Sequence, residues 1–180
     1  MGPSACLLWL LFAAAPAAGP VPTGQSGQSG DLVVNLYNQA RLDVYAPDGT
    51  LKVTTAGNGT GTQWIGATIL PGGRFATSRR SPARGINVFD ASGTEIATFD
   101  TPEVSSTGDL SVFSDGTLAL VDYISSQIEY YPPARTHIVT VSEPGFSIPW
   151  GKYINADDVL WVGDNPDVWR FDRSGKLLER

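Results

Sequence analysis

A pattern that returns about every 43 residues from Asp31 onward is the strongest constraint on how this chain can fold. Each copy contains a polar turn, a short apolar segment, a polar loop and a segment that ends in an aromatic residue. The polar turns are Pro71-Gly72-Gly73, Ser114-Asp115-Gly116 and Ala156-Asp157-Asp158. A fixed period of roughly 40 to 50 residues is typical of arrays in which similar units pack side by side.

Within each copy, apolar and polar residues alternate with a period of two, which is typical of strands. Arg74 to Thr77 and Ile86 to Phe89 are two such segments. Hairpins follow at Asp48-Gly49, Ser92-Gly93 and Ser174-Gly175, where Gly suits a turn position with positive φ. The sequence therefore predicts an all-β fold, a β-propeller of about four four-stranded blades, whose units start near residues 31, 74, 117 and 159.

The first unit differs from the others because only a segment of Gly, Gln and Ser precedes it. We expect the other three units to begin with inner strands at 65–69, 109–113 and 151–155, which gives about fifteen strands in total. The array is then either a small ring with one incomplete blade or part of a larger propeller. In the second case, exposed strand edges and apolar faces would favour self-association that completes the ring.

Composition and charge exclude one class of partner. The chain has 180 residues, of which 42% are hydrophobic, and its 20 Gly and 13 Pro suit a β protein with many turns. The formal net charge is -6. Because a protein that follows nucleic-acid phosphates needs a basic stripe, we expect no nucleic-acid partner.

The first 30 residues contain no charged side chain. Residues 1–19 predict a signal peptide with an apolar run from Ala5 to Ala15, and hence a secreted, extracellular or periplasmic protein. That run is too short to span a membrane. Residues 20–30 predict a flexible linker, native or engineered. The only cysteine, Cys6, lies in the predicted signal peptide, so the mature chain would have no disulfide and no thiol nucleophile.

A family resemblance rests on three of the units, and the copy from Val162 to Phe171 is shorter by two residues. Val121-Asp122 followed by a polar loop, Ile128 and Tyr131 resembles the NHL repeat, and Ile86-Asn87-Val88-Phe89 is similar to its strand-and-turn half. This resemblance implies a β-propeller, typically of six blades. Six such blades need more residues than this chain has.

Few residues point to catalysis. His137 is the only histidine, and no nucleophile motif accompanies it. Asp122, Asn155 and Asp164 could offer oxygen ligands to Ca²⁺, although such residues more often accept hydrogen bonds from backbone amides in turns. Metal-dependent lactonases and esterases of the SMP-30 and gluconolactonase type hold one Ca²⁺ at the mouth of a propeller channel. These three residues are the candidate metal ligands of that alternative function.

Aromatic and basic residues suggest a binding surface instead. Tyr45, Phe89, Tyr131 and Phe171 recur at one repeat position, which predicts packing between blades. Trp64 and Trp150 lie beside loops between units, so we expect them to be exposed for ligand contacts.

Three arginines and one asparagine complete the set of candidates. Arg79, Arg80 and Arg84 form the densest basic patch, and they are expected in a loop, where Arg79 and Arg84 are candidate ligand contacts. Asn58 begins a glycosylation sequon. The sequence thus favours a non-catalytic module that binds a protein or small ligand without a cofactor, with the calcium-dependent hydrolase as the alternative.

Overall fold

The computed structural model of the chain describes residues 30–37, 39–56, 61–134, 136–147 and 149–180. The predicted signal peptide, the predicted linker up to residue 29 and Asn58 lie outside these residues. The described residues form fifteen strands and no helix, which confirms the all-β class and the expected number of strands. No helix among them could cross a membrane.

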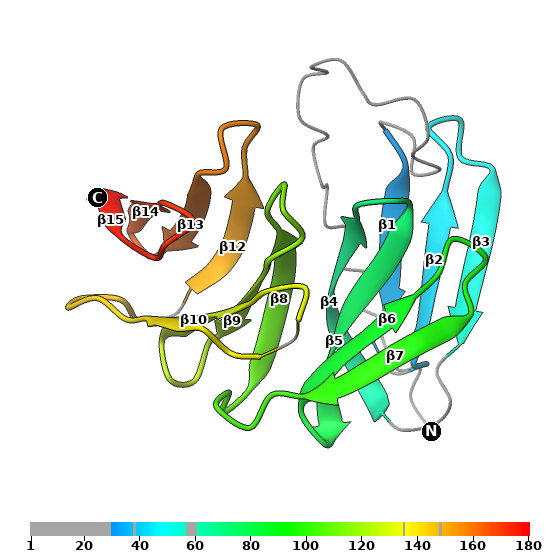
Figure 1. Cartoon of the computed structure of the whole chain (residues 1–180), viewed down its shortest axis with the longest axis horizontal. Helices are drawn as coiled ribbons and strands as arrows, with labels where there is room; N and C mark the ends of the chain where they lie inside the picture. The colour runs from blue at the N-terminus through cyan, green and yellow to red at the C-terminus, as the bar shows by residue number, and fades with distance from the viewer. Residues whose placement is uncertain (1–29, 38, 57–60, 135, 148) are drawn as a thin grey trace, which may run out of the picture.

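The strands form one three-stranded and three four-stranded antiparallel sheets, named blades 1 to 4 in chain order. Blade 1 has the order β1-β2-β3 and is the incomplete unit that the sequence predicts. The four blades lie side by side in chain order (Figure 1). The first strand of each four-stranded blade contacts the blade before it, because β4 packs against β1, β8 against β4 and β5, and β12 against β8 and β9.

The strands of the first two blades are β1 (Leu32–Leu36), β2 (Arg41–Tyr45), β3 (Leu51–Ala56), β4 (Gly61–Leu70), β5 (Arg74–Pro82), β6 (Gly85–Phe89) and β7 (Glu95–Asp100). Those of the last two blades are β8 (Thr107–Val112), β9 (Leu118–Asp122), β10 (Gln127–Tyr131), β11 (Val139–Val141), β12 (Pro149–Ile154), β13 (Leu160–Asp164), β14 (Asp167–Phe171) and β15 (Leu177–Glu179).

The hydrophobic core lies between the blades. Three apolar clusters fill the spaces between blades 1 and 2, 2 and 3, and 3 and 4. Successive side chains of a strand point to opposite faces, so one strand supplies two cores. In β10, Tyr130 packs toward blade 4 and Tyr131 packs toward blade 2. Each blade is therefore held from both sides wherever it has two neighbours.

The packing predicted for the repeated aromatic position is confirmed in three of the four blades. Phe89, Tyr131 and Phe171 are at most 1% exposed. Tyr45 is half-buried, because it lies on the face of blade 1 that points away from blade 2. Tyr45 is more exposed than the other three because of its place on blade 1, and not because of its residue type.

The predicted hairpin turns are also confirmed. Gly49, Gly93 and Gly175 have φ values of 84°, 87° and 84°, which a residue with a Cβ adopts only with strain. Asp90 and Asp172 begin two of these turns, and each accepts a hydrogen bond from the backbone amide two residues on. In the first turn Asp48, directly before Gly49, accepts from the Thr50 amide. The three turns thus share the glycine at positive φ, and each contains an aspartate side chain that accepts a backbone hydrogen bond.

One charged side chain lies inside the packing between blades 3 and 4. The Lys152 side chain is 0% exposed, and its Nζ lies 4.0 Å from Oδ2 of Asp109 in β8. Nζ has no hydrogen-bond partner among the described residues. Burial lowers the pKa of Lys152 to about 8, and the nearby Asp109 carboxylate opposes this shift only in part.

This burial predicts that stability depends on pH. The pKa of Lys152 in the folded chain is below its ordinary value of 10.5, so the unfolded chain binds more protons between these two pH values. The free energy of unfolding should therefore rise by about 2 kcal/mol between about pH 7.5 and about pH 9.5. Urea denaturation at both pH values measures this change.

Lys152→Met is the matched variant, because it keeps the length of the side chain and removes the charge. It should be more stable than the parent near neutral pH and should lose most of this rise. An equal rise in both proteins would contradict the assignment.

Candidate functional site

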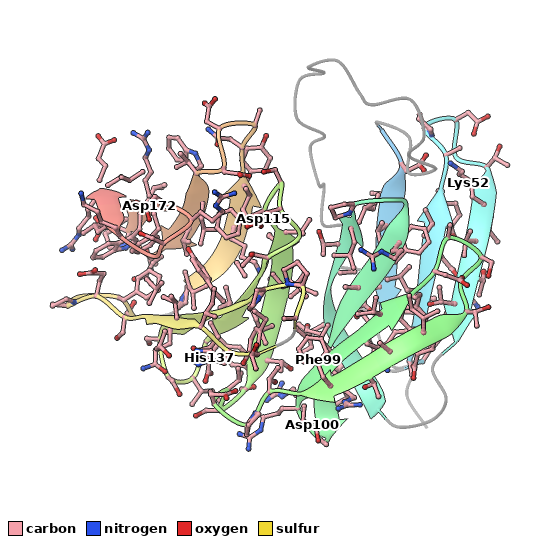
Figure 2. All side chains as sticks on the ribbon, viewed as in Figure 1. Lys52, Phe99, Asp100, Asp115, His137 and Asp172 are labelled. Atoms are coloured by element: carbon pink, nitrogen blue, oxygen red, sulfur yellow. The ribbon has the colours of Figure 1, made fainter. Side chains whose placement is uncertain are left out.

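Loops from blades 2, 3 and 4 gather at one end of the sheets. The connections between second and third strands (83–84, 123–126 and 165–166) and the crossovers between blades (101–106 and 142–147) lie at this end, which we call the loop face. The hairpins between first and second strands and between third and fourth strands lie at the opposite end, the turn face. Asp100, at the loop face, is at the lower edge of Figure 2, and Asp115, at the turn face, lies well above it.

Asp122 anchors the crossover that leads into blade 3. Its side chain is completely buried at the end of β9. The carboxylate accepts hydrogen bonds from the backbone amides of Ser105 and Ser106 in the crossover. It also accepts from the amides of Ile124 and Ser125 in its own loop, each at 3.2 Å. All of these contacts are backbone contacts, so Asp122 fixes the shape of the loop face.

Asp164 has the same position in blade 4 and likewise anchors the crossover that leads into its blade. It is 3% exposed at the end of β13. The carboxylate accepts from the backbone amide of Ser147 at 2.7 Å and from the Ser147 hydroxyl at 2.9 Å. In both blades the serine precedes the aspartate by 17 residues. This recurring spacing is the signal from which the anchoring serines could have been found in the sequence.

Arg79 occupies the equivalent register position in blade 2. The expectation that Arg79 lies in a loop and contacts a ligand is wrong. β5 continues to Pro82, so Arg79 lies inside a strand and is 2% exposed. Its guanidinium donates to the Ala83 carbonyl at 2.7 Å and to Asp100 at 2.6 Å. A Cβ on the paired Gly85 would lie 2.4 Å from Arg79 Nη2, so Gly85 leaves the space that this guanidinium fills.

The proposed metal ligands do not come together. Asn155 follows β12 at the turn face, where its Oδ1 accepts from the amides of Asp157 and Val159. Asp164 lies at the other end of the same strand pair, opposite Pro149. Among the described residues, no three His, Cys, Asp or Glu side chains are placed to hold a metal ion. The three oxygen-bearing residues act as anchors of turns and loops.

The two tryptophans proposed as exposed contacts differ in outcome. Trp64 is 0% exposed, with its ring centroid 5.4 Å from that of Phe89, so the expectation of exposure is wrong. It is buried because blade 1 covers the start of β4, where the Trp64 amide donates to the Tyr37 carbonyl. Trp150 belongs to β12, and its side chain lies outside the described residues.

Arg84 is the predicted contact residue that the structure leaves exposed on the loop face. Its Nη1 donates to the Ser105 carbonyl at 2.8 Å, and its own carbonyl accepts from the Thr101 amide. These bonds join loop 83–84 to crossover 101–106. A cleft of about 210 Å³ lies between them. Its lining residues are Ala83, Arg84, Asp100, Thr101 and Pro102.

The crossover is held from a third direction by Tyr131. Its hydroxyl donates to the Glu103 carboxylate at 3.1 Å. Burial, together with that carboxylate, raises the pKa of the Tyr131 hydroxyl well above its ordinary value, so the hydroxyl remains a hydrogen-bond donor. The wall of the cleft is thus fixed by Asp122, Tyr131 and Arg84 together.

His137 contacts a buried carboxylate of its own blade. Its Nε2 lies 2.6 Å from Oε2 of Glu129, which is 1% exposed, and Thr140 donates to the same oxygen at 2.7 Å. Glu129 has the register position of Asn87 in blade 2, which is likewise buried and bonded to a residue of its last strand, Glu95. His137 therefore completes a buried polar pair at the outer part of blade 3.

No protein-family model and no curated protein matches this chain. Solved structures of β-propeller proteins do match it. The structure of a streptogramin B lyase is similar at a TM-score of 0.70 and 17% identity, covering 84% of this chain and 51% of the lyase. A catalytically inactive virginiamycin B lyase from Staphylococcus aureus, solved with quinupristin, gives 0.70 and 18%, covering 88% and 53%. The WD40 β-propeller domain of Doa1 gives 0.68 and 14%, covering 85% and 50%.

These similarities establish the fold. At such low identity they show a β-propeller architecture, which confirms the predicted fold class, and they carry no activity over to this chain. The chain spans about half the length of the structures it matches. Membership of the NHL-repeat family stays a prediction.

The anchoring role of Asp122 gives a direct test. Asp122→Ala leaves four backbone amides without their acceptor, and it should lower the free energy of unfolding by about 2 to 4 kcal/mol in urea denaturation. Asp157→Ala, at an exposed position on the turn face, is the control and should stay within about 0.5 kcal/mol of the parent. Stabilisation by added Ca²⁺ that disappears in Asp122→Ala would contradict a purely structural role.

Proposed function

We propose that this chain is a non-catalytic recognition module that binds carboxylate-bearing peptide segments on its loop face, beside Arg84. The exposed Arg84 guanidinium at the edge of a pre-formed cleft is the observation that carries this proposal. A guanidinium can bind a carboxylate through two parallel hydrogen bonds, which combines charge with a defined geometry.

The size of the cleft supports a peptide and not an enclosed small substrate. Its volume of about 210 Å³ is below the roughly 300 to 1,000 Å³ of typical small-molecule sites. One or two side chains of an extended segment fit such a space. Pro102 and Ala83 offer apolar contacts beside the charged group.

The distribution of charge around the cleft also supports the proposal. The Asp100 side chain is 72% exposed, but its carboxylate is paired with the buried Arg79 guanidinium at 2.6 Å. The Arg84 side chain donates a hydrogen bond to a neutral backbone carbonyl, that of Ser105. Its positive charge is therefore available to a ligand. Because the whole chain carries -6, this recognition depends on short-range contact and not on long-range attraction.

The fixed loops reduce the cost of binding. The backbone amide of Thr101 donates to the Arg84 carbonyl, and the Arg84 side chain donates back to the Ser105 carbonyl. A surface that is ordered before it binds loses little conformational entropy on association. The hydrolase alternative has no comparable support, since the described residues do not bring candidate metal ligands together.

A pair of charge reversals tests the proposal. The probes are labelled synthetic peptides of equal length that differ only in the number of Glu residues, and fluorescence anisotropy measures their binding to the full chain. Affinity should rise with Glu content. Arg84→Glu should weaken the best peptide by roughly tenfold or more, which corresponds to about 1.4 kcal/mol for each factor of ten.

Arg74→Glu is the matched control. Arg74 is an exposed arginine of the same blade that also donates to one backbone carbonyl, that of Pro71, but it lies at the turn face. It should leave peptide affinity unchanged. Equal losses in the two variants, or affinity that does not depend on Glu content, would overturn the proposal. Hydrolysis of a lactone or aryl ester that needs Ca²⁺ and stops on chelation would favour the enzyme instead.

A further inference from the structure

The face of blade 4 that points away from blade 3 is exposed where every other blade is covered. Val168 is 54% exposed. Val168 is the second residue of β14, and the equivalent second residues of β10, β6 and β2 are Ile128, Ile86 and Leu42. Each of these three side chains is 0% exposed, because the next blade packs on it. The same position thus marks an interface three times in this chain.

Larger side chains extend this exposed patch across three strands. Tyr153 in β12 pairs with Trp161 in β13, which pairs with Arg170 in β14. Tyr153 is 39% exposed, and the Arg170 guanidinium lies over the Trp161 ring at 4.6 Å. Trp161 is half-buried, whereas Ala119 at its position in blade 3 is fully buried. A contiguous apolar face of this kind is typical of an interaction surface.

The opposite end of the array presents the complementary half of such an interface. On blade 1, the face away from blade 2 carries Leu32, Val34 and Tyr45, all half-buried. In blade 4 the equivalent residues are Leu160, Val162 and Phe171, each 0% exposed against blade 3. Blade 1 therefore has the apolar residues that one blade uses to cover the preceding one.

The hairpin turn of blade 1 also lacks the contact that the equivalent turns of blades 2 and 4 make with a preceding blade. A Cβ on Gly93 would lie 2.8 Å from Val53, and one on Gly175 would lie 2.8 Å from Val139, so each turn packs on the last strand of the preceding blade. A Cβ on Gly49 would meet nothing within 4 Å. The turn of blade 1 therefore has the same glycine conformation as the two packed turns, but the space beside Gly49 is open.

We propose that the outer face of blade 4 docks on the free face of blade 1 of a second copy of this chain, and reciprocally, so that two copies close one ring of eight blades. The chain spans about half the length of the matched structures, so two copies of the spanned part supply a comparable length. Eight blades lie within the usual range for propellers, and two head-to-tail contacts related by a two-fold axis form a closed assembly.

The repeat also predicts a polar contact in this interface. In the contact between blades 3 and 4, the Tyr130 hydroxyl donates to the Asp172 carbonyl at 3.3 Å. Arg170 has the position of Tyr130, and Ala46 has the position of Asp172. The Arg170 guanidinium would therefore donate to the Ala46 carbonyl of the second copy.

Light scattering coupled to size-exclusion chromatography tests the proposal on the full chain. The parent should have twice the monomer mass. Val168→Glu should raise the dissociation constant of the dimer by roughly a hundredfold or more, as for the loss of a buried interface anchor. Val168 is exposed within one copy, so the fold should survive, and circular dichroism checks this. Ile124→Glu is the control, because Ile124 is a 62% exposed residue on the loop face, and it should remain a dimer.

A mixing experiment separates the proposed pairing from other associations. Val34→Glu should also give monomers. An equimolar mixture of Val34→Glu and Val168→Glu should recover mass, because one of its two interfaces then contains neither substitution. A parent that stays monomeric, mass that does not recover on mixing, or dissociation by Ile124→Glu would overturn the proposal. A monomeric parent would indicate that further blades or a different protein cover these faces.

Discussion

Packing between neighbouring sheets is the interaction on which this structure depends, because one antiparallel sheet of three or four strands cannot bury its apolar side chains alone. The three apolar clusters lie between blades and not within them. Two buried polar side chains inside these contacts find their hydrogen-bond partners within their own blade. Glu129 and Asn87 are buried and bonded to residues of their own blades. The blades can therefore press together while Glu129 and the Asn87 amide nitrogen keep hydrogen-bond partners within their own blades.

A single register position governs the loop face. At the end of the second strand, Asp122 and Asp164 bind the amides of the incoming crossover, whereas Arg79 binds a carbonyl and the Asp100 carboxylate. The sign of the charge is reversed, yet each side chain ties neighbouring loops together. The cleft beside Arg84 lies in blade 2, the blade that uses the arginine. Blade 2 therefore differs from blades 3 and 4 both in the side chain that anchors its loops and in the cleft beside these loops.

The sequence predicted the architecture better than the site. Repetition and alternation identified the fifteen strands, the incomplete first blade and the glycine turns, because these depend on local geometry and on period. The expectation for Trp64 failed since burial there depends on Phe89, which is far along the chain. The expectation for Arg79 failed since β5 runs further than its apolar pattern. Asn155 and Asp164 were grouped by composition, although the strands between them place them at opposite ends.

The neighbouring tyrosines of β10 limit how this chain can change over evolutionary time. Tyr130 and Tyr131 serve different cores, and their hydroxyls are bonded to different blades or loops. One inserted or deleted residue within this strand would exchange the two rings and disturb both neighbours at once. Variation in length should therefore accumulate at the connections, while the spacing inside each strand stays constant. Homologues could differ widely in the surfaces that they present and still keep the same number of residues in β10.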